Sequence, residues 1–163
     1  MHHTLRASFI ALTMIFAVTL STQAQAACLK GYYRFADSQT ATAWKARPAD
    51  YAGGGPHGLS VFEDLSSDQY KIMAARRNHE LGKNKTLVYR VPCNAAITGN
   101  LDVTADPTHL TNWTEPGGYA HSVISYAGAT DAGEFNNGMV RGKTAPTFLF
   151  DNAVFVIRIP PVQ

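Results

Sequence analysis

The first 26 residues are arranged like a secretory signal peptide, and this limits what the rest of the chain can be. A polar, mildly cationic stretch around Arg6 precedes an apolar run over residues 7–20, and the segment closes with Ala24-Gln25-Ala26. This order is typical of a cleavable leader. The apolar run is shorter than the ~20 residues of a membrane-spanning helix, and no second run of that length follows. We therefore predict an exported protein, periplasmic or secreted, whose mature part is residues 27–163.

The mature part has the size of one ordinary domain and carries almost no net charge. Loss of Arg6 with the leader lowers the formal net charge from +2 to +1. Nucleic acids and anionic membranes are bound by strongly basic surfaces, so neither is indicated as a partner. We expect a single α+β domain over residues 27–163.

Both cysteines, Cys28 and Cys93, belong to the mature part. Export would carry them to an oxidising compartment, where paired thiols persist as disulfides. We predict a structural disulfide that closes a loop of 64 intervening residues and stabilises the fold by about 4 kcal/mol. A metal site is not expected, because neither the cysteines nor His57 and His121 have the spacing of metal ligands.

Short β-like runs alternate with two helical stretches in the mature part. The first helix passes through residues 43–45, and the second covers 66–81, where Ser66 and Gln69 have capping-box spacing. Asp151 and Asn152 suit the tight turn of a final hairpin. The expected strands are 29–35, 59–63, 86–91, 100–104, 119–127, 147–150 and 153–159. These elements predict an α+β fold with a mixed, mainly antiparallel sheet of about six strands and two helices packed on one side of it.

Three places combine reactive side chains with glycines or strand ends. Arg34, inside an aromatic strand, can offer its planar guanidinium to a phosphate or carboxylate, or form a surface ion pair. The glycine-rich loop Gly53–Gly58 brings His57 towards Ser60 and either holds a ligand on its backbone N–H groups or is a long turn. The third place is Tyr119-Ala-His121-Ser122-Val123-Ile124, where alternation lets only one of His121 and Ser122 face a shared cleft; a histidine satisfied within the sheet is the alternative.

The sequence lacks the usual signatures of two classes of hydrolase. A Ser-His-Asp arrangement can be assembled from these residues, but no G-x-S-x-G motif accompanies it. Paired carboxylates are missing from the predicted strand ends, so the machinery of glycoside hydrolysis is not visible.

The order of Tyr33-Arg34, a short helix and Gly58-Leu59-Ser60-Val61-Phe62 resembles the start of the ADP-ribosyltransferase-like fold. The resemblance covers about residues 30–63 and is greatest with small bacterial toxins, including a type VI secretion effector family. In that superfamily the arginine holds a nicotinamide dinucleotide, the serine lies beneath the nicotinamide ring, and a later glutamate activates the acceptor.

The resemblance implies that Arg34 and Ser60 contact the ligand, with Gly58 beside them, and that NAD is a substrate. The usual Glu-x-Glu motif of a late strand is missing. His57, His121 and Glu134 are therefore the candidate catalytic residues.

Three functions follow from these observations. The first is a secreted ADP-ribosyltransferase-like toxin or effector that binds a nucleotide beside the Gly53–Gly58 loop. The second is a non-enzymatic periplasmic or secreted module that binds a protein partner through the 105–118 loop, with Trp113 as its anchor. The third is a metal-independent nuclease in which His57 and His121 act as acid and base.

Overall fold

The structure is a computed structural model, and it describes residues 28–29, 31–79, 85–106 and 121–160. The expected leader, Trp113 and most of the 105–118 loop lie outside these residues. Within the described part of the chain, every helix is too short or too polar to cross a membrane.

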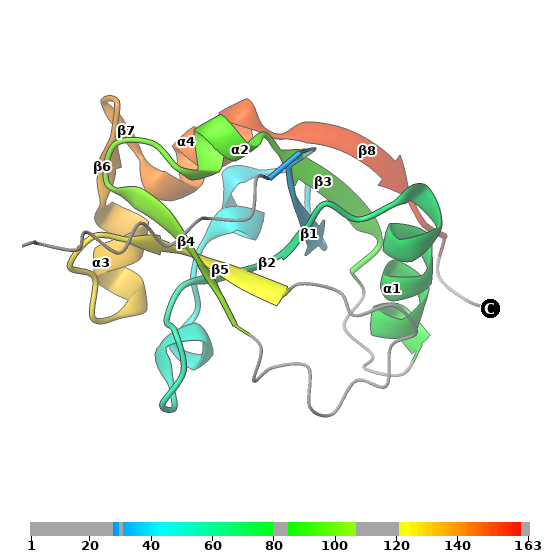
Figure 1. Ribbon diagram of the computed structural model, residues 1–163, viewed down its shortest axis with the longest axis horizontal. Helices are drawn as coiled ribbons and strands as arrows, with labels where there is room; N and C mark the ends of the chain where they lie inside the picture. Colours follow the sequence, from blue (N-terminus) through cyan, green and yellow to red (C-terminus); the bar gives the residue numbers. More distant parts are fainter. Residues whose placement is uncertain (1–27, 30, 80–84, 107–120, 161–163) are drawn as a thin grey trace, which may run out of the picture.

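A six-stranded sheet forms the centre of the protein (Figure 1), with the strand order β4-β5-β2-β1-β3-β8. Each pair of neighbouring strands in it is antiparallel. The expected α+β fold with a mainly antiparallel sheet is therefore confirmed. The strands of this sheet are β1 (Tyr32–Ala36), β2 (Leu59–Glu63), β3 (Leu87–Val91), β4 (Leu101–Ala105), β5 (His121–Tyr126) and β8 (Val154–Arg158). A separate small hairpin joins β6 (Met139–Val140) to β7 (Lys143–Thr144).

Helices cover both faces of the sheet. Alternation along β1 places Tyr32 in one apolar cluster and Tyr33 in the other, because successive side chains of a strand point to opposite faces. The helical elements are η1 (Ala41–Trp44), η2 (Pro48–Tyr51), α1 (Ser67–His79), α2 (Cys93–Ala96), α3 (Ala132–Asn137) and α4 (Ala145–Asn152).

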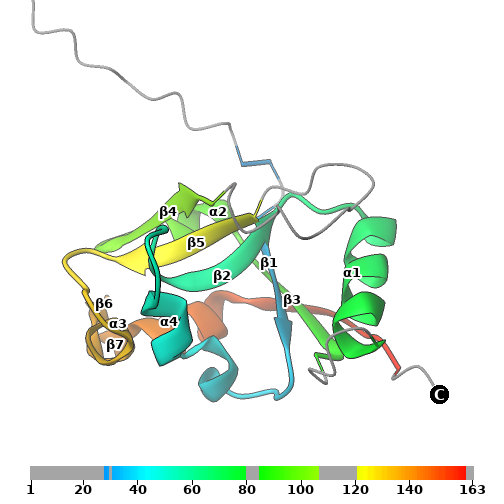
Figure 2. The same ribbon diagram turned by 90° about the horizontal axis from the view of Figure 1, so that it is seen from below.

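The larger cluster lies between the sheet and the helices η1, α3 and α4, which contribute Trp44, Phe135 and Leu149. The smaller cluster lies on the other face, where Met73 of α1 packs with Phe35. Figures 1 and 2 show α1 and α3 at opposite ends of the molecule. The prediction of helices on one side of the sheet is wrong, because β1 is apolar on both of its faces and needs cover on each.

The capping box at the start of α1 forms as the sequence predicts. The backbone N–H of Gln69 donates to Ser66 Oγ at 3.3 Å, and the N–H of Ser66 donates to Gln69 Oε1 at 2.8 Å. These two bonds satisfy donors that the first helical turn leaves without an intrahelical partner. The helix therefore begins one residue after Ser66.

The prediction of a hairpin at residues 147–159 is wrong for its first strand, because residues 147–150 belong to α4. Pro146 stands in the first turn of this helix, where its missing N–H costs nothing. Ala145, Phe148 and Leu149 are buried, and their spacing of three and four places them on one helical face. Asn152 does not form a tight turn; its Nδ2 donates to the carbonyl of Phe148 at 2.8 Å and closes the helix.

The predicted disulfide between Cys28 and Cys93 is present, with 5.9 Å between the two Cα atoms. It joins the segment before β1 to the first residue of α2, just after β3. Asp64 holds the same segment, because its carboxylate accepts the N–H groups of Leu29 at 2.8 Å and Gly31 at 3.0 Å. The approach to β1 is thus fixed at two points.

β1 and β2 separate soon after they meet. Their register joins Tyr32 to Glu63 and Tyr33 to Phe62, whereas β1 and β3 pair along the whole of β1. Arg34 therefore stands where the two strands part.

Candidate functional site

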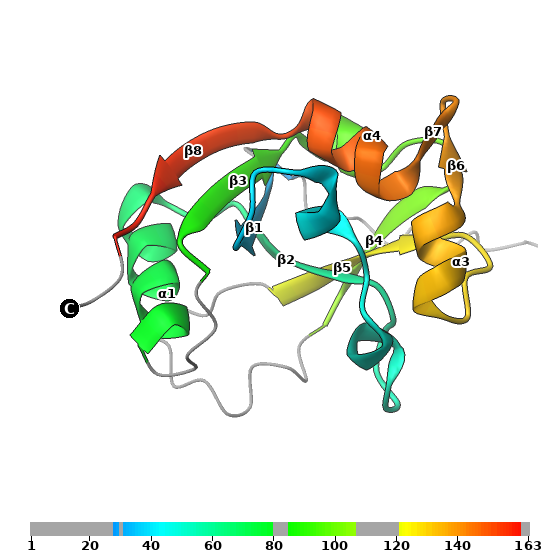
Figure 3. The same cartoon turned by 180° about the vertical axis from the view of Figure 1, so that it is seen from behind.

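A cavity of about 420 Å³ lies beside the point where β1 and β2 separate. Its walls come from β1, η2, the 53–58 loop, β2 and β5, together with Lys85 and Asp106. Figure 3 shows the segment between β1 and β2, in blue to cyan, folded into short helical turns. The predicted site residues on its walls are Arg34, His57, Gly58, Ser60 and His121. Five of the six predicted catalytic and ligand-binding residues thus share one cavity.

Arg34 is buried, and its guanidinium bridges two segments. Nε donates to the carbonyl of Ala43 at 2.7 Å, and Nη1 donates to the carbonyl of Ser60 at 2.8 Å. The side chain also lies 5.9 Å from the centre of the Trp44 ring, a cation–π distance. Arg34 is therefore a buried cation that is held in place where β1 leaves β2.

Ser60, His121 and Asp106 form a continuous polar chain. Ser60 Oγ lies at hydrogen-bond distance, 2.7 Å, from His121 Nε2, whereas His121 Nδ1 lies 3.2 Å from Asp106 Oδ2, an ion-pair distance without the alignment of a hydrogen bond. His121 and Asp106 are 3% and 6% exposed as whole residues, whereas Ser60 is half-buried. His121 faces the cavity, and the structure places its neighbour Ser122 outside the cavity walls.

The glycine-rich loop packs back on η2. The ring of His57 stacks on that of Tyr51, with 5.5 Å between centroids and 14° between planes. Burial, with smaller contributions from Asp131, Asp50 and Glu134, raises the pKa of Tyr51 to about 12. Gly58 begins the approach of β2 to β5 with φ near +149°, and a Cβ there would clash with the carbonyl of Ile124. Only glycine lets the loop enter the sheet at this point.

Two further cations stand on the cavity walls, each paired with a carboxylate. Arg47 Nη2 donates to Asp50 Oδ1 at 2.8 Å, and Lys85 Nζ lies 2.6 Å from Asp37 Oδ2. The hydrogen bond from Lys85 holds the pKa of Asp37 below its usual value. The cavity walls thus carry cations from three separate segments, together with the carboxylates of Asp50 and Asp106.

Glu134 has a structural position at the start of α3. Its Oε2 accepts the N–H of Thr130 at 2.6 Å and the hydroxyl of the same residue at 3.0 Å. Its own N–H donates to Asp131 Oδ1 at 2.9 Å, so the two acidic residues cap the helix. Glu134 is not among the described residues on the cavity walls.

The sequence did not point to Asp106, Arg47 or Lys85. Asp106 follows β4 directly, and its N–H donates to the carbonyl of His121 at 2.9 Å. A carboxylate at a strand end was the available signal, but only the pairing of β4 with β5 shows which histidine it meets. Arg47 and Lys85 carried no signal beyond their charge.

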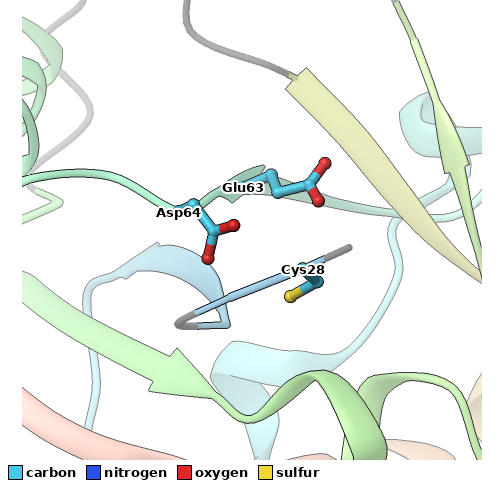
Figure 4. Close-up of side chains that lie close together, drawn as sticks. All are labelled: Cys28, Glu63 and Asp64. Atoms are coloured by element: carbon cyan, nitrogen blue, oxygen red, sulfur yellow. The ribbon is translucent and has the colours of Figure 1, made fainter. Parts of the chain in front are cut away.

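Cys28, Glu63 and Asp64 lie close together on the far end of β2 (Figure 4), with their potential ligand atoms within 4.8 Å of one another. The sulfur of Cys28 is bonded to Cys93, and Asp64 accepts two backbone N–H groups. Burial, followed by the charge of Asp64, raises the pKa of Glu63. The Cys28 sulfur is therefore not a free thiolate, and the cluster offers a cation only its two carboxylates.

Comparisons with protein-family models, with curated proteins and with solved structures gave no match to this chain.

Proposed function

We propose that this chain is an exported ADP-ribosyltransferase-like protein that binds a nicotinamide dinucleotide in the cavity beside the Gly53–Gly58 loop. The observation that carries the proposal is the convergence of Arg34, Ser60 and His121, from three strands, on one cavity. In the reaction, nicotinamide leaves with the electrons of its bond to ribose, and a nucleophile takes over the ADP-ribosyl group.

The size and charge of the cavity suit such a ligand. A volume of about 420 Å³ falls within the range of small-molecule sites. Arg34, Arg47 and Lys85 supply positive charge for a pyrophosphate, and the planar forks of the arginines match phosphate oxygens. The stacked rings of Tyr51 and His57 provide a flat aromatic edge beside it.

The same geometry is less suited to the nuclease hypothesis. His57 and His121 both line the cavity, as that hypothesis needs. However, both ring nitrogens of His121 already face partners, Ser60 and Asp106. A histidine held in this way is better placed to act on the hydroxyl of Ser60 than to contact a phosphodiester directly.

Isothermal titration calorimetry of the purified protein with NAD, ADP-ribose and ATP tests the proposal. We expect saturable binding of NAD with a dissociation constant below about 1 mM, and slow release of nicotinamide. Arg34→Lys keeps the charge but loses the planar fork, so it should weaken binding at least about tenfold.

Arg158→Lys is the matched control, because Arg158 is exposed on β8 and is not among the described residues on the cavity walls. It should bind NAD like the wild type. Absence of binding at millimolar NAD by a protein that unfolds cooperatively would overturn the proposal. Equal binding of ATP and NAD would show a general nucleotide site instead.

A further inference from the structure

Ser60, His121 and Asp106 are arranged in that order, with the imidazole between the hydroxyl and the carboxylate. All three residues line the cavity; Asp106 and His121 are buried, whereas Ser60 is half-buried. A carboxylate facing Nδ1 favours a proton on that nitrogen, which leaves the lone pair of Nε2 for the hydroxyl proton of Ser60.

The sheet holds the side chains of Ser60, His121 and Asp106 in fixed positions. In the register of β2 and β5, Ser60 stands opposite Val123 and Phe62 stands opposite His121, so Ser60 and His121 point to the same face as diagonal neighbours. The Phe62 ring packs edge-on against the imidazole, with 5.1 Å between centroids. The backbone bond from Asp106 to His121 fixes the third member.

We propose that Ser60 is an activated nucleophile for acyl transfer from esters that carry an anionic group. His121 is its general base, and Asp106 is a positioning residue. This activity goes beyond the proposed dinucleotide function and does not depend on it.

In the first step Ser60 Oγ attacks the carbonyl carbon, and its proton passes to His121 Nε2. The ester C–O bond then breaks, and the alcohol leaves with that proton. Water attacks the acyl-serine in the second step and gives its proton to the same nitrogen, which returns it to Ser60. The sum is ester plus water to carboxylic acid plus alcohol.

The charges around Ser60 select the substrate class. Arg34 lines the cavity and donates to the backbone carbonyl of Ser60, so a positive charge lies next to this residue. Arg47 and Lys85 line the same cavity and suit a carboxylate or phosphate elsewhere on the substrate.

A fluorophosphonate probe tests the nucleophile directly. Ser60 Oγ would displace fluoride from phosphorus, and intact-mass and peptide analysis of the wild-type protein should place one phosphonyl group on Ser60. Ser60→Ala should remove the label. Ser122→Ala is the matched control, because that serine is buried on the other side of β5, and it should label like the wild type.

Two further variants test the roles of the other residues. His121→Gln should slow labelling at least about 100-fold. Asp106→Asn should lower the maximal labelling rate about tenfold or more while the half-saturating probe concentration stays the same, and Asp106→Glu should restore part of the rate. A merely structural role would leave the labelling rate of the folded fraction unchanged, whatever the change in the unfolding temperature.

Turnover of p-nitrophenyl hemisuccinate against p-nitrophenyl butyrate tests the substrate class. We expect the anionic ester to be preferred, and Arg47→Gln to reduce that preference. A folded wild-type protein that takes no label at Ser60, or a label that forms equally fast in His121→Gln, would overturn the proposal. Labelling without NAD binding would leave this inference standing while the dinucleotide proposal fails.

Discussion

Asp106 and His121 are joined twice, once through the backbone and once through their side chains. The N–H of Asp106 donates to the carbonyl of His121 at 2.9 Å, and the carboxylate lies 3.2 Å from Nδ1 of the same residue. Because both side chains are buried, the loss of one partner leaves a polar group in the interior without its match.

Asp106→Asn should therefore lower the free energy of unfolding by about 1–3 kcal/mol, the usual cost of a buried polar group that loses its partner. Urea denaturation followed by circular dichroism measures this. An unchanged midpoint would contradict the structural importance of the pair.

The ion pair of Asp37 and Lys85 offers the contrasting case, because the Asp37 side chain is 49% exposed. Asp37→Asn should cost less than about 1 kcal/mol at neutral pH. The pKa of Asp37 is lowered in the folded state, so the pair stabilises above the usual carboxyl pKa and is lost as pH falls through the folded value. The difference between variant and wild type should therefore shrink on acidification, as unfolding curves at several pH values would show.

Gly58→Ala should destabilise the protein by about 2 kcal/mol or more, because it combines a strained φ with a clash. The added Cβ would push the start of β2 away from Ile124 of β5. Gly54→Ala is the control from the same loop, since nothing lies within 4 Å of its Cβ position. Thermal unfolding of both variants should show a loss for the first and almost no change for the second; equal effects would contradict the close approach.

Tyr51→Phe should reduce the loss of stability at alkaline pH. The hydroxyl of Tyr51 is buried without a hydrogen-bond partner in the described part of the chain, and its pKa is about 12 instead of 10.0. Between these two values the unfolded chain releases the proton while the folded protein keeps it, so stability falls as pH rises. The variant should keep about 1–2 kcal/mol that the wild type loses between pH 10 and 12. Parallel curves for the two proteins over this range would refute the assignment.

Replacement of both cysteines by serine should cost about 2–5 kcal/mol. The bond joins residues 65 positions apart, so its loss frees a long loop in the unfolded chain. Chemical denaturation of Cys28→Ser/Cys93→Ser, with wild type in dithiothreitol for comparison, measures the effect. Equal stability with and without the bond would contradict it.

Elements with strong local signals could be predicted from the sequence. β2 has the predicted bounds of 59–63, and the capping residues of α1 are paired as their spacing indicates. The first strand of the expected final hairpin failed because Thr147, Phe148 and Phe150 favour strands locally. Burial of one face against η1 decides for a helix there, and that contact is invisible in the local sequence.

The residues of the site also differ in whether the sequence alone could reveal them. Arg34 and Ser60 could be selected from a short motif, because they stand in two early strands close in sequence. Asp106 could not, because it reaches His121 only through the pairing of β4 with β5. Glu134 is a candidate from the sequence because it is an acid in the later part of the chain. In the structure, its carboxylate and backbone form local hydrogen bonds at the start of α3.

The strand β8 forms one margin of the sheet, and its exposed Val154 and Phe155 would attract a strand from another molecule. Pro160 and Pro161 follow Ile159 directly, and neither has an N–H to donate. A foreign strand could thus align with Val154–Arg158 but find no continuing ladder beyond it. This margin of the sheet therefore offers a foreign strand only a short stretch for pairing.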